Sequence, residues 1–304
     1  MKRLTEQSGY AKLVAVLALC LVVAGCYYLF SYRPSHSAKT VAHKAAVAKQ
    51  IAKIDKGKQL QTKLQAALQQ VVTVTPPDGN VDLAVYDSTT GATVHFTFGT
   101  GPFITASVMK LSLLETMLWH NQQHGISSLT SSQLAQATPM IENSDNDSAT
   151  DVYLADGGSS GLNTFLKRIG ATSTTAGDHW GLTPTTALDQ LKVVNEVAYP
   201  GKLLTAGSAS QANNLMDHVE ANQQWGVSGG VPAGVTVRLK NGWLPNSDID
   251  GTSGWNVNSI GHVHGQGVDY TIAVLTNEDR TEQSGINTIE ALSTAIWNTI
   301  SAAK

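Results

Sequence analysis

The spacing of hydrophobic and polar positions changes several times along the chain, and each change predicts a different element. Residues 13–30 form an apolar run without a charge. Residues 35–70 are rich in Ala, Lys and Gln, which favour a helix. Apolar and polar residues then alternate at residues 81–86 and 93–98, with the turn-forming segment Asp87-Ser-Thr-Thr-Gly91 between them. Alternation is typical of strands, so this region predicts a hairpin.

Helical spacing dominates the middle of the chain. Met109, Leu113 and Met117 recur at intervals of four, so Ser107 is expected to open a helix. Strand patterns return only at residues 235–239, 256–264 and 270–275, and a last helix is expected at residues 285–300. Strands at both ends with helices between them predict an α+β fold. We expect an antiparallel sheet with flanking terminal helices, plus an all-helical subdomain at about residues 107–230.

Three regions follow from these patterns. Residues 1–32 are predicted to be a signal anchor or a lipoprotein signal, since basic residues precede the apolar run and Val23-Ala-Gly-Cys26 resembles a lipoprotein processing box. Residues 33–70 are predicted to be a helical stalk, either a solvated spacer or a basic surface held against anionic lipid or wall polymer. Residues 71–304 form the predicted domain. We expect attachment to the cell membrane, with this domain extracytoplasmic.

Charge and cysteine content narrow the range of functions. Between Arg33 and Lys63 the formal charge is +7, whereas beyond Lys63 nine Lys and Arg residues oppose 21 Asp and Glu residues, giving −12. An acidic domain repels polyanions, so no nucleic-acid partner is expected. The two cysteines, Cys20 and Cys26, lie in the apolar run, so the domain has no thiol chemistry. No metal or organic cofactor is implied, and a monomer is expected.

The first candidate motif is Ser107-Val-Met-Lys110 at the expected helix start. Three residues cover nearly one helical turn, so both side chains lie on one face and the lysine can take the proton of the serine hydroxyl. Burial would lower the lysine pKa enough for that task. The alternative is an ordinary helix cap beside a surface lysine. The tail segment Ser301-Ala-Ala-Lys304 matches the same pattern by chance, so the motif alone is weak.

Two further motifs follow in order. Ser144-Asp-Asn146 lies between helical stretches, either as a polar turn or with Ser144 relaying a proton and Asn146 holding Lys110 and the substrate amide. Lys240-Asn-Gly242 ends a predicted strand, where the lysine can point into a groove and the glycine lets substrate approach the backbone. Asn-Gly is also a common turn dipeptide, so a plain hairpin turn is the alternative.

As an ordered set the three motifs resemble those of class A β-lactamases and the related penicillin-binding D,D-peptidases, over about residues 81–300. The resemblance implies that Ser107 is the acylated nucleophile, Lys110 its base, Ser144 the proton relay and Lys240 an electrostatic partner of Ser144 and of a substrate carboxylate. It also implies an oxyanion hole formed by the backbone N–H groups of Ser107 and Trp243. The further substrate-binding candidates are Asn146, Asn241 and Gly242.

The sequence departs from that family at three places. Class A enzymes carry a glutamate that activates the deacylating water, but residues 171–183 contain only one acid, Asp178, as a candidate substitute. The segment between Ser107 and Ser144 is short, and Asn241 replaces the usual Thr or Ser. We therefore expect a serine hydrolase acting on a β-lactam or a peptidoglycan stem peptide through acyl-Ser107. A D,D-peptidase with slow deacylation and a non-catalytic wall-binding relative stay open as alternatives.

Overall fold

The computed structural model describes residues 37–304, with side chains described from residue 43 onward. Residues 54–304 form one compact unit, and helix α2 (Ser37–Val74) spans the boundary at residue 53. Within residues 37–304 no helix is long and apolar enough to cross a membrane. The predicted anchor or lipoprotein signal at residues 1–32, with Cys20 and Cys26, lies outside the described residues.

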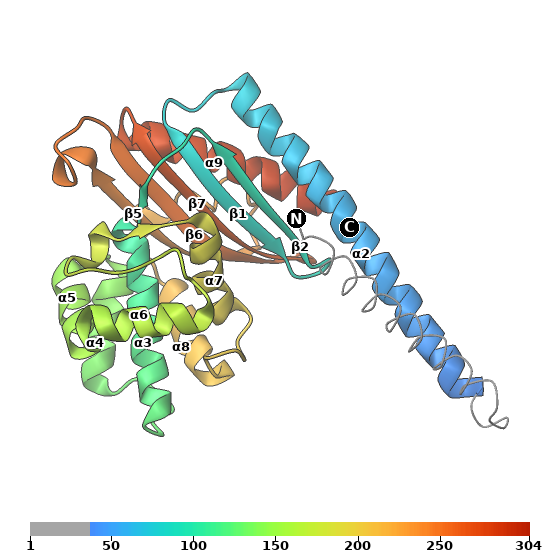
Figure 1. Ribbon diagram of the computed structural model, residues 1–304, viewed down its shortest axis with the longest axis horizontal. Coiled ribbons are helices and arrows are strands. Elements are labelled where there is room, and N and C mark those ends of the chain that lie inside the picture. The colour runs from blue at the N-terminus through green and yellow to red at the C-terminus, as the bar shows by residue number, and fades with distance from the viewer. Residues whose placement is uncertain (1–36) are drawn as a thin grey trace, which may run out of the picture. The chain divides into compact units, whose positions relative to one another are not determined.

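A five-stranded antiparallel sheet forms one layer of the compact unit (Figure 1). Its order is β2-β1-β7-β6-β5, so the N-terminal strands and the C-terminal strands meet where β1 pairs with β7. Val81 faces both Phe98 of β2 and Thr276 of β7. The predicted hairpin and the predicted α+β class are confirmed. The strands are β1 (Asn80–Asp87), β2 (Ala92–Phe98), β5 (Thr236–Pro245), β6 (Trp255–Gly265) and β7 (Val268–Asp279).

Among the side chains of α2 that are described, from residue 43 onward, those in the second half of the helix contribute to the core. Leu60, Leu64, Leu68 and Val72 recur every four residues, which places them on one helix face, and all four are buried. The Gln61 side-chain amide beside this face donates to the backbone carbonyl of Thr93 in β2 at 2.8 Å. Residues 43–56 are exposed. The predicted domain start at residue 71 is therefore too late, because the buried stripe makes residues 57–74 part of the domain rather than of a solvated stalk.

The helices between the sheet's two halves occupy the region predicted to be helical. Several begin at a threonine whose side-chain oxygen accepts the backbone N–H three residues later, as Thr130 does for α4 and Thr186 for α7. The elements are η2 (Ala106–Val108), α3 (Met109–Gln123), α4 (Ser131–Glu142), α5 (Asn146–Ala155), α6 (Gly158–Ile169), η3 (Trp180–Leu182), α7 (Ala187–Ala198), α8 (Ala206–Met216) and η4 (Ala221–Gln223).

Short elements join these helices to the sheet. The two-residue strands β3 (Phe103–Ile104) and β4 (Pro184–Thr185) pair with each other, so the chain just before η2 lies beside the chain just after η3. A 3₁₀ turn, η5 (Asn246–Asp248), follows β5. Helix α9 (Glu282–Ser301) packs against β6 and β7, and α7 packs against β7 and β1. The helical region thus meets the sheet through α7 and also where η2 contacts β5 and β6.

Candidate active site

Ser107 lies in the 3₁₀ turn η2, immediately before α3. The preceding Ala106 has φ of 45°, a left-handed conformation that a non-glycine residue adopts only under tertiary constraint. The constraint is visible: the buried amide of Asn258 on β6 donates to the carbonyls of Ile104 and Thr105, at 2.7 and 3.1 Å. The expectation that Ser107 opens a helix is therefore correct in place, although the first turn is 3₁₀ and α3 itself begins at Met109.

Lys110 lies one turn further along and is fully buried. Its Nζ is 2.9 Å from Ser107 Oγ, 2.5 Å from the Ser144 carbonyl oxygen, 2.7 Å from Asn146 Oδ1 and 3.1 Å from Ser144 Oγ. Carbonyl oxygens can only accept hydrogen bonds. In a neutral lysine the two N–H bonds therefore point to the Ser144 and Asn146 oxygens, and the lone pair is left for the Ser107 hydroxyl proton.

The electrostatics favour that neutral form. Burial lowers the pKa of Lys110 to about 8, and the Asp145 carboxylate opposes part of this fall. A lysine with this pKa is a usable base near neutral pH, which an exposed lysine is not. Geometry and charge thus agree on Lys110 as the group able to accept the Ser107 proton.

Ser144 and Asn146 are positioned by the junction between α4 and α5. Ser144 has φ of 60°, which turns the chain sharply after α4. Asp145 then caps α5 by accepting the backbone N–H of Ser148 at 2.7 Å, so Asn146 becomes the first residue of that helix. The turn aims the Ser144 carbonyl and the Asn146 amide at the same Nζ atom. The polar-turn interpretation of this motif is therefore correct as local structure and is also the means of holding Lys110.

Lys240 joins the cluster from the sheet. It lies on β5, is fully buried, and donates from Nζ to Ser144 Oγ at 3.0 Å. Burial, with a smaller contribution from the charge of Lys110, lowers the pKa of Lys240 to about 7. Ser144 Oγ consequently lies between two lysine amines, and the four predicted catalytic residues Ser107, Lys110, Ser144 and Lys240 form one continuous set of contacts.

The rest of the third motif differs from its sequence-based interpretation. Residues 240–242 lie inside β5, which continues to Pro245, so Asn241-Gly242 is not a hairpin turn. Because side chains alternate along a strand, Asn241 points to the opposite side from Lys240. It is buried and donates to the carbonyls of Gln223 and Trp225, at 2.8 and 3.0 Å. The prediction that the Asn241 side chain binds substrate is therefore wrong: it fixes the loop behind the strand.

Gly242 and Trp243 continue the same alternation. A Cβ atom on Gly242 would lie 2.6 Å from Ser107 N and 2.7 Å from Val108 N, so only glycine lets β5 run this close to η2. The Trp243 indole lies on the Asn241 side of β5, 5.7 Å from the ring of Trp225. Its backbone follows Gly242 at the edge of the cavity. The oxyanion hole formed by the Ser107 and Trp243 N–H groups stays a prediction. The close approach of β5 to η2 at Gly242 is compatible with it.

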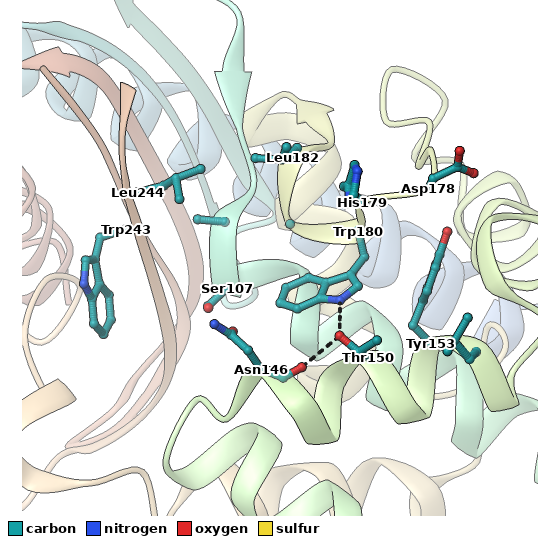
Figure 2. Close-up of a pocket in the computed structure, with 13 residues that line it drawn as sticks. Ser107, Asn146, Thr150, Tyr153, Asp178, His179, Trp180, Leu182, Trp243 and Leu244 are labelled. Atoms are coloured by element: carbon teal, nitrogen blue, oxygen red, sulfur yellow. Dashed lines mark hydrogen bonds between the residues drawn. The ribbon is translucent and has the colours of Figure 1, made fainter. Parts of the chain in front are cut away.

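A cavity of about 380 Å³ opens beside Ser107. Figure 2 shows Ser107 and Asn146 at one end and Tyr153 and Asp178 at the other, with the Trp180 indole between them. Asp178 lies beyond His179, and its carboxylate points away from Ser107 (Figure 2). The prediction that Asp178 activates a water at Ser107 is therefore wrong. A residue in a loop without regular structure gives no sequence signal for the direction of its side chain, so the residue type alone could not predict its role.

Trp180 is the site residue that the motifs did not single out. Lys110 Nζ lies over its ring, 5.2 Å from the ring centroid. Its indole N–H donates to Thr150 Oγ1 at 3.3 Å (Figure 2). The only sequence signal was an aromatic residue next to the candidate acid, in Gly177-Asp-His-Trp180. Within residues 37–304 no cluster of three His, Cys, Asp or Glu side chains is placed to hold a metal ion.

Comparisons with known proteins place this arrangement in a family. A model of the β-lactamase enzyme family matches residues 117–300, more than half of the chain. The chain belongs to the β-lactamase enzyme family. The span matched by this β-lactamase family model begins after Ser107 and Lys110, so the assignment of those two residues rests on the geometry given above. No curated protein matches the chain.

Solved structures of β-lactamases and a penicillin-binding protein share the fold. A class A β-lactamase from Bacteroides cellulosilyticus is 18% identical with a TM-score of 0.67, covering 80% of this chain and 99% of its own. A class A β-lactamase from Mycobacterium abscessus is 18% identical with a TM-score of 0.63, covering 77% and 98%. A mutant of PBP-A, solved as an acyl-enzyme complex with penicillin G, is 19% identical with a TM-score of 0.63, covering 78% and 96%.

Proposed function

We propose that this chain is a serine hydrolase that forms an acyl-Ser107 intermediate with a β-lactam or with an amide of a peptidoglycan stem peptide. Membership of the β-lactamase enzyme family supports the general class. The observation that carries the proposal is the position of Lys110, with Nζ 2.9 Å from Ser107 Oγ and its other short contacts made to the Ser144 carbonyl and Asn146 Oδ1. A lysine held in this way is set up to accept one specific proton.

Acylation then proceeds through groups that are already in contact. Lys110 takes the hydroxyl proton of Ser107 as Oγ attacks the carbonyl carbon of the amide. The oxyanion that forms is stabilised by backbone N–H groups at the junction of η2 and β5. Ser144 delivers its proton to the leaving nitrogen and is reprotonated from the lysine cluster, so the C–N bond breaks with a balanced transfer of one proton. Lys240 stabilises the charge that develops on Ser144 Oγ, 3.0 Å away.

Deacylation is the step for which the site has no dedicated base. Asp178 is the one acidic side chain that lines the cavity within the described residues, and it points away from Ser107. A water molecule that must release the acyl group needs a base within hydrogen-bonding reach. We therefore favour a penicillin-binding protein of the D,D-peptidase type with slow deacylation of β-lactams over an efficient β-lactamase.

The test is intact mass spectrometry of the full-length protein in detergent after addition of benzylpenicillin. We expect a lasting adduct on Ser107, no adduct in Ser107→Ala, and an unchanged adduct in Ser301→Ala. The last variant alters the chance Ser-x-x-Lys match at the end of α9, far along the chain from the site. A transient adduct with loss of the antibiotic would instead identify a β-lactamase, and protein that binds muropeptides without any covalent product would favour a non-catalytic relative.

Attachment to the membrane is a separate proposal that rests on the sequence alone. The apolar run at residues 13–30 follows Lys2, Arg3 and Lys12, as in signal anchors and lipoprotein signals. We propose that this segment tethers an extracytoplasmic domain, where its substrates would be found. Fractionation of cells should recover the protein with membranes, and external protease should digest the domain in intact protoplasts. Recovery in the soluble cytosolic fraction would contradict this placement.

A further inference from the structure

The Trp180 indole fills the space next to the proposed base. Lys110 Nζ lies 5.2 Å from the centre of the ring. A water between them would need about 2.9 Å to the nitrogen and roughly 3.5 Å to the ring carbons, so more than about 6 Å in all. No water fits between the two groups. The ring therefore excludes water from the side of Lys110 that faces Trp180.

One hydrogen bond holds the indole itself, and two more hold the loop that carries Trp180. Its N–H donates to Thr150 Oγ1 on α5 at 3.3 Å, and its backbone carbonyl accepts from the Thr183 hydroxyl at 2.8 Å. Thr183 is tied in turn to the segment before Ser107, because its carbonyl accepts the Thr105 N–H at 3.0 Å. The loop that carries Trp180 is thus attached both to α5 and to the strand that leads into the nucleophile.

We propose that Trp180 shields acyl-Ser107 from hydrolysis by excluding water from the face of the ester next to Lys110. This inference rests on the proposed acyl-enzyme function and adds a cause for its slow deacylation. When the ring is removed, a water can lie against Lys110, which takes one water proton while the oxygen attacks the ester carbon. Collapse of that intermediate breaks the bond to Ser107 Oγ, which recovers the proton from Lys110 and releases the free acid.

The experiment follows the lifetime of the penicilloyl adduct. Full-length wild-type protein, Trp180→Ala and Trp180→Phe are acylated with benzylpenicillin, free antibiotic is removed, and intact mass is recorded over time. We expect the adduct of Trp180→Ala to decay at least tenfold faster than that of wild type, with penicilloic acid released. Trp180→Phe retains a ring over Lys110 and should stay within about threefold of wild type. Acylation rates measured in parallel separate this effect from damage to the first step.

Two further variants keep the test decisive if Trp180→Ala folds poorly. Thr150→Val removes the acceptor of the indole N–H and should shorten the adduct lifetime by a smaller factor. Leu188→Ala shortens an exposed side chain on α7 that does not line the cavity, so its adduct should persist like that of wild type. Equal lifetimes in wild type, Trp180→Ala and Thr150→Val would overturn the shielding role while leaving acylation intact. Absence of any adduct in wild type would overturn the proposed function and the shielding role together.

Discussion

Replacing Asp145 with asparagine should make this protein acylate faster at neutral and acidic pH, although it removes a charge next to the candidate site. The Asp145 carboxylate raises the pKa of Lys110 against the dominant effect of burial, which brings that pKa to about 8. At pH 7 a lysine with a pKa of about 8 is neutral in about one molecule in ten, whereas a lysine at its usual pKa is neutral in about one in three thousand. Any further fall of the pKa therefore adds reactive base.

The size of the effect follows from solvent screening. Asp145 is partly exposed, so its charge changes the free energy of the Lys110 ammonium by roughly 0.5 to 1 kcal/mol. This corresponds to about two- to fivefold more neutral Lys110 below pH 7. The gain should disappear toward pH 9, where Lys110 is neutral in both proteins. Asparagine caps a helix as well as aspartate does, so α5 and the melting temperature should be preserved.

The assay is the second-order rate constant of acylation by a fluorescent penicillin between pH 5.5 and 9. Burial also brings the pKa of Lys240 to about 7, so the pH dependence of the acylation rate reflects the titration of both lysines. The effect of Asp145 is therefore measured as the ratio of the rate constant of Asp145→Asn to that of wild type at each pH. Asp147→Asn is the matched control, since Asp147 lies on the same first turn of α5 and is exposed. A ratio at or below one at pH 6, or an equal gain in the control, would refute the electrostatic argument.

Gly242→Ala should lower the acylation rate about 100-fold, measured with the same fluorescent penicillin, because its Cβ would displace the backbone at Ser107. Leu64→Ala should reduce the free energy of unfolding by about 2–5 kcal/mol in a denaturant titration, whereas the exposed Val47→Ala should leave it unchanged. Burial raises the pKa of Glu115 well above its usual range. Glu115 therefore lowers the free energy of unfolding as the pH rises above about 4.3, where the unfolded chain loses this proton and the folded protein keeps it. The melting temperature of Glu115→Gln should match that of wild type near pH 4 and exceed it at pH 7.

The sequence was sufficient for what local chemistry and periodicity determine. The three motifs were enough to predict that Ser107, Lys110, Ser144 and Lys240 lie in one cluster. Each motif lies at a helix start, a helix junction or a strand that the hydrophobic pattern of the sequence indicates. The same reasoning missed the direction of Asn241. Its direction depends on β5 continuing through residue 245, whereas the sequence predicts that the strand ends at this motif.

Two other features depend on contacts between distant segments. The composition predicts a stalk over the buried half of α2 because lysine and glutamine separate its leucines, whereas the structure buries those leucines in the core. Trp180 faces Lys110 because Thr150, on another helix, accepts its N–H. The contact of Trp180 leaves no local pattern, whereas the four-residue spacing of Leu60, Leu64, Leu68 and Val72 is a local signal for a buried helix face.

The pairing of β1 with β7 has a consequence for how the protein is made. The two strands align Asn80 with Asn277, and the side chains of these residues bond to each other across 197 positions of sequence. At a synthesis rate of about 5 to 20 residues per second, β1 waits roughly 10 to 40 s for its partner. The hairpin of β1 and β2 spends that time with one edge unpaired, while the helices from α3 to α8 can already assemble from local contacts. A chaperone or the translocation machinery that covers this edge would therefore keep it from pairing with the strands of other chains.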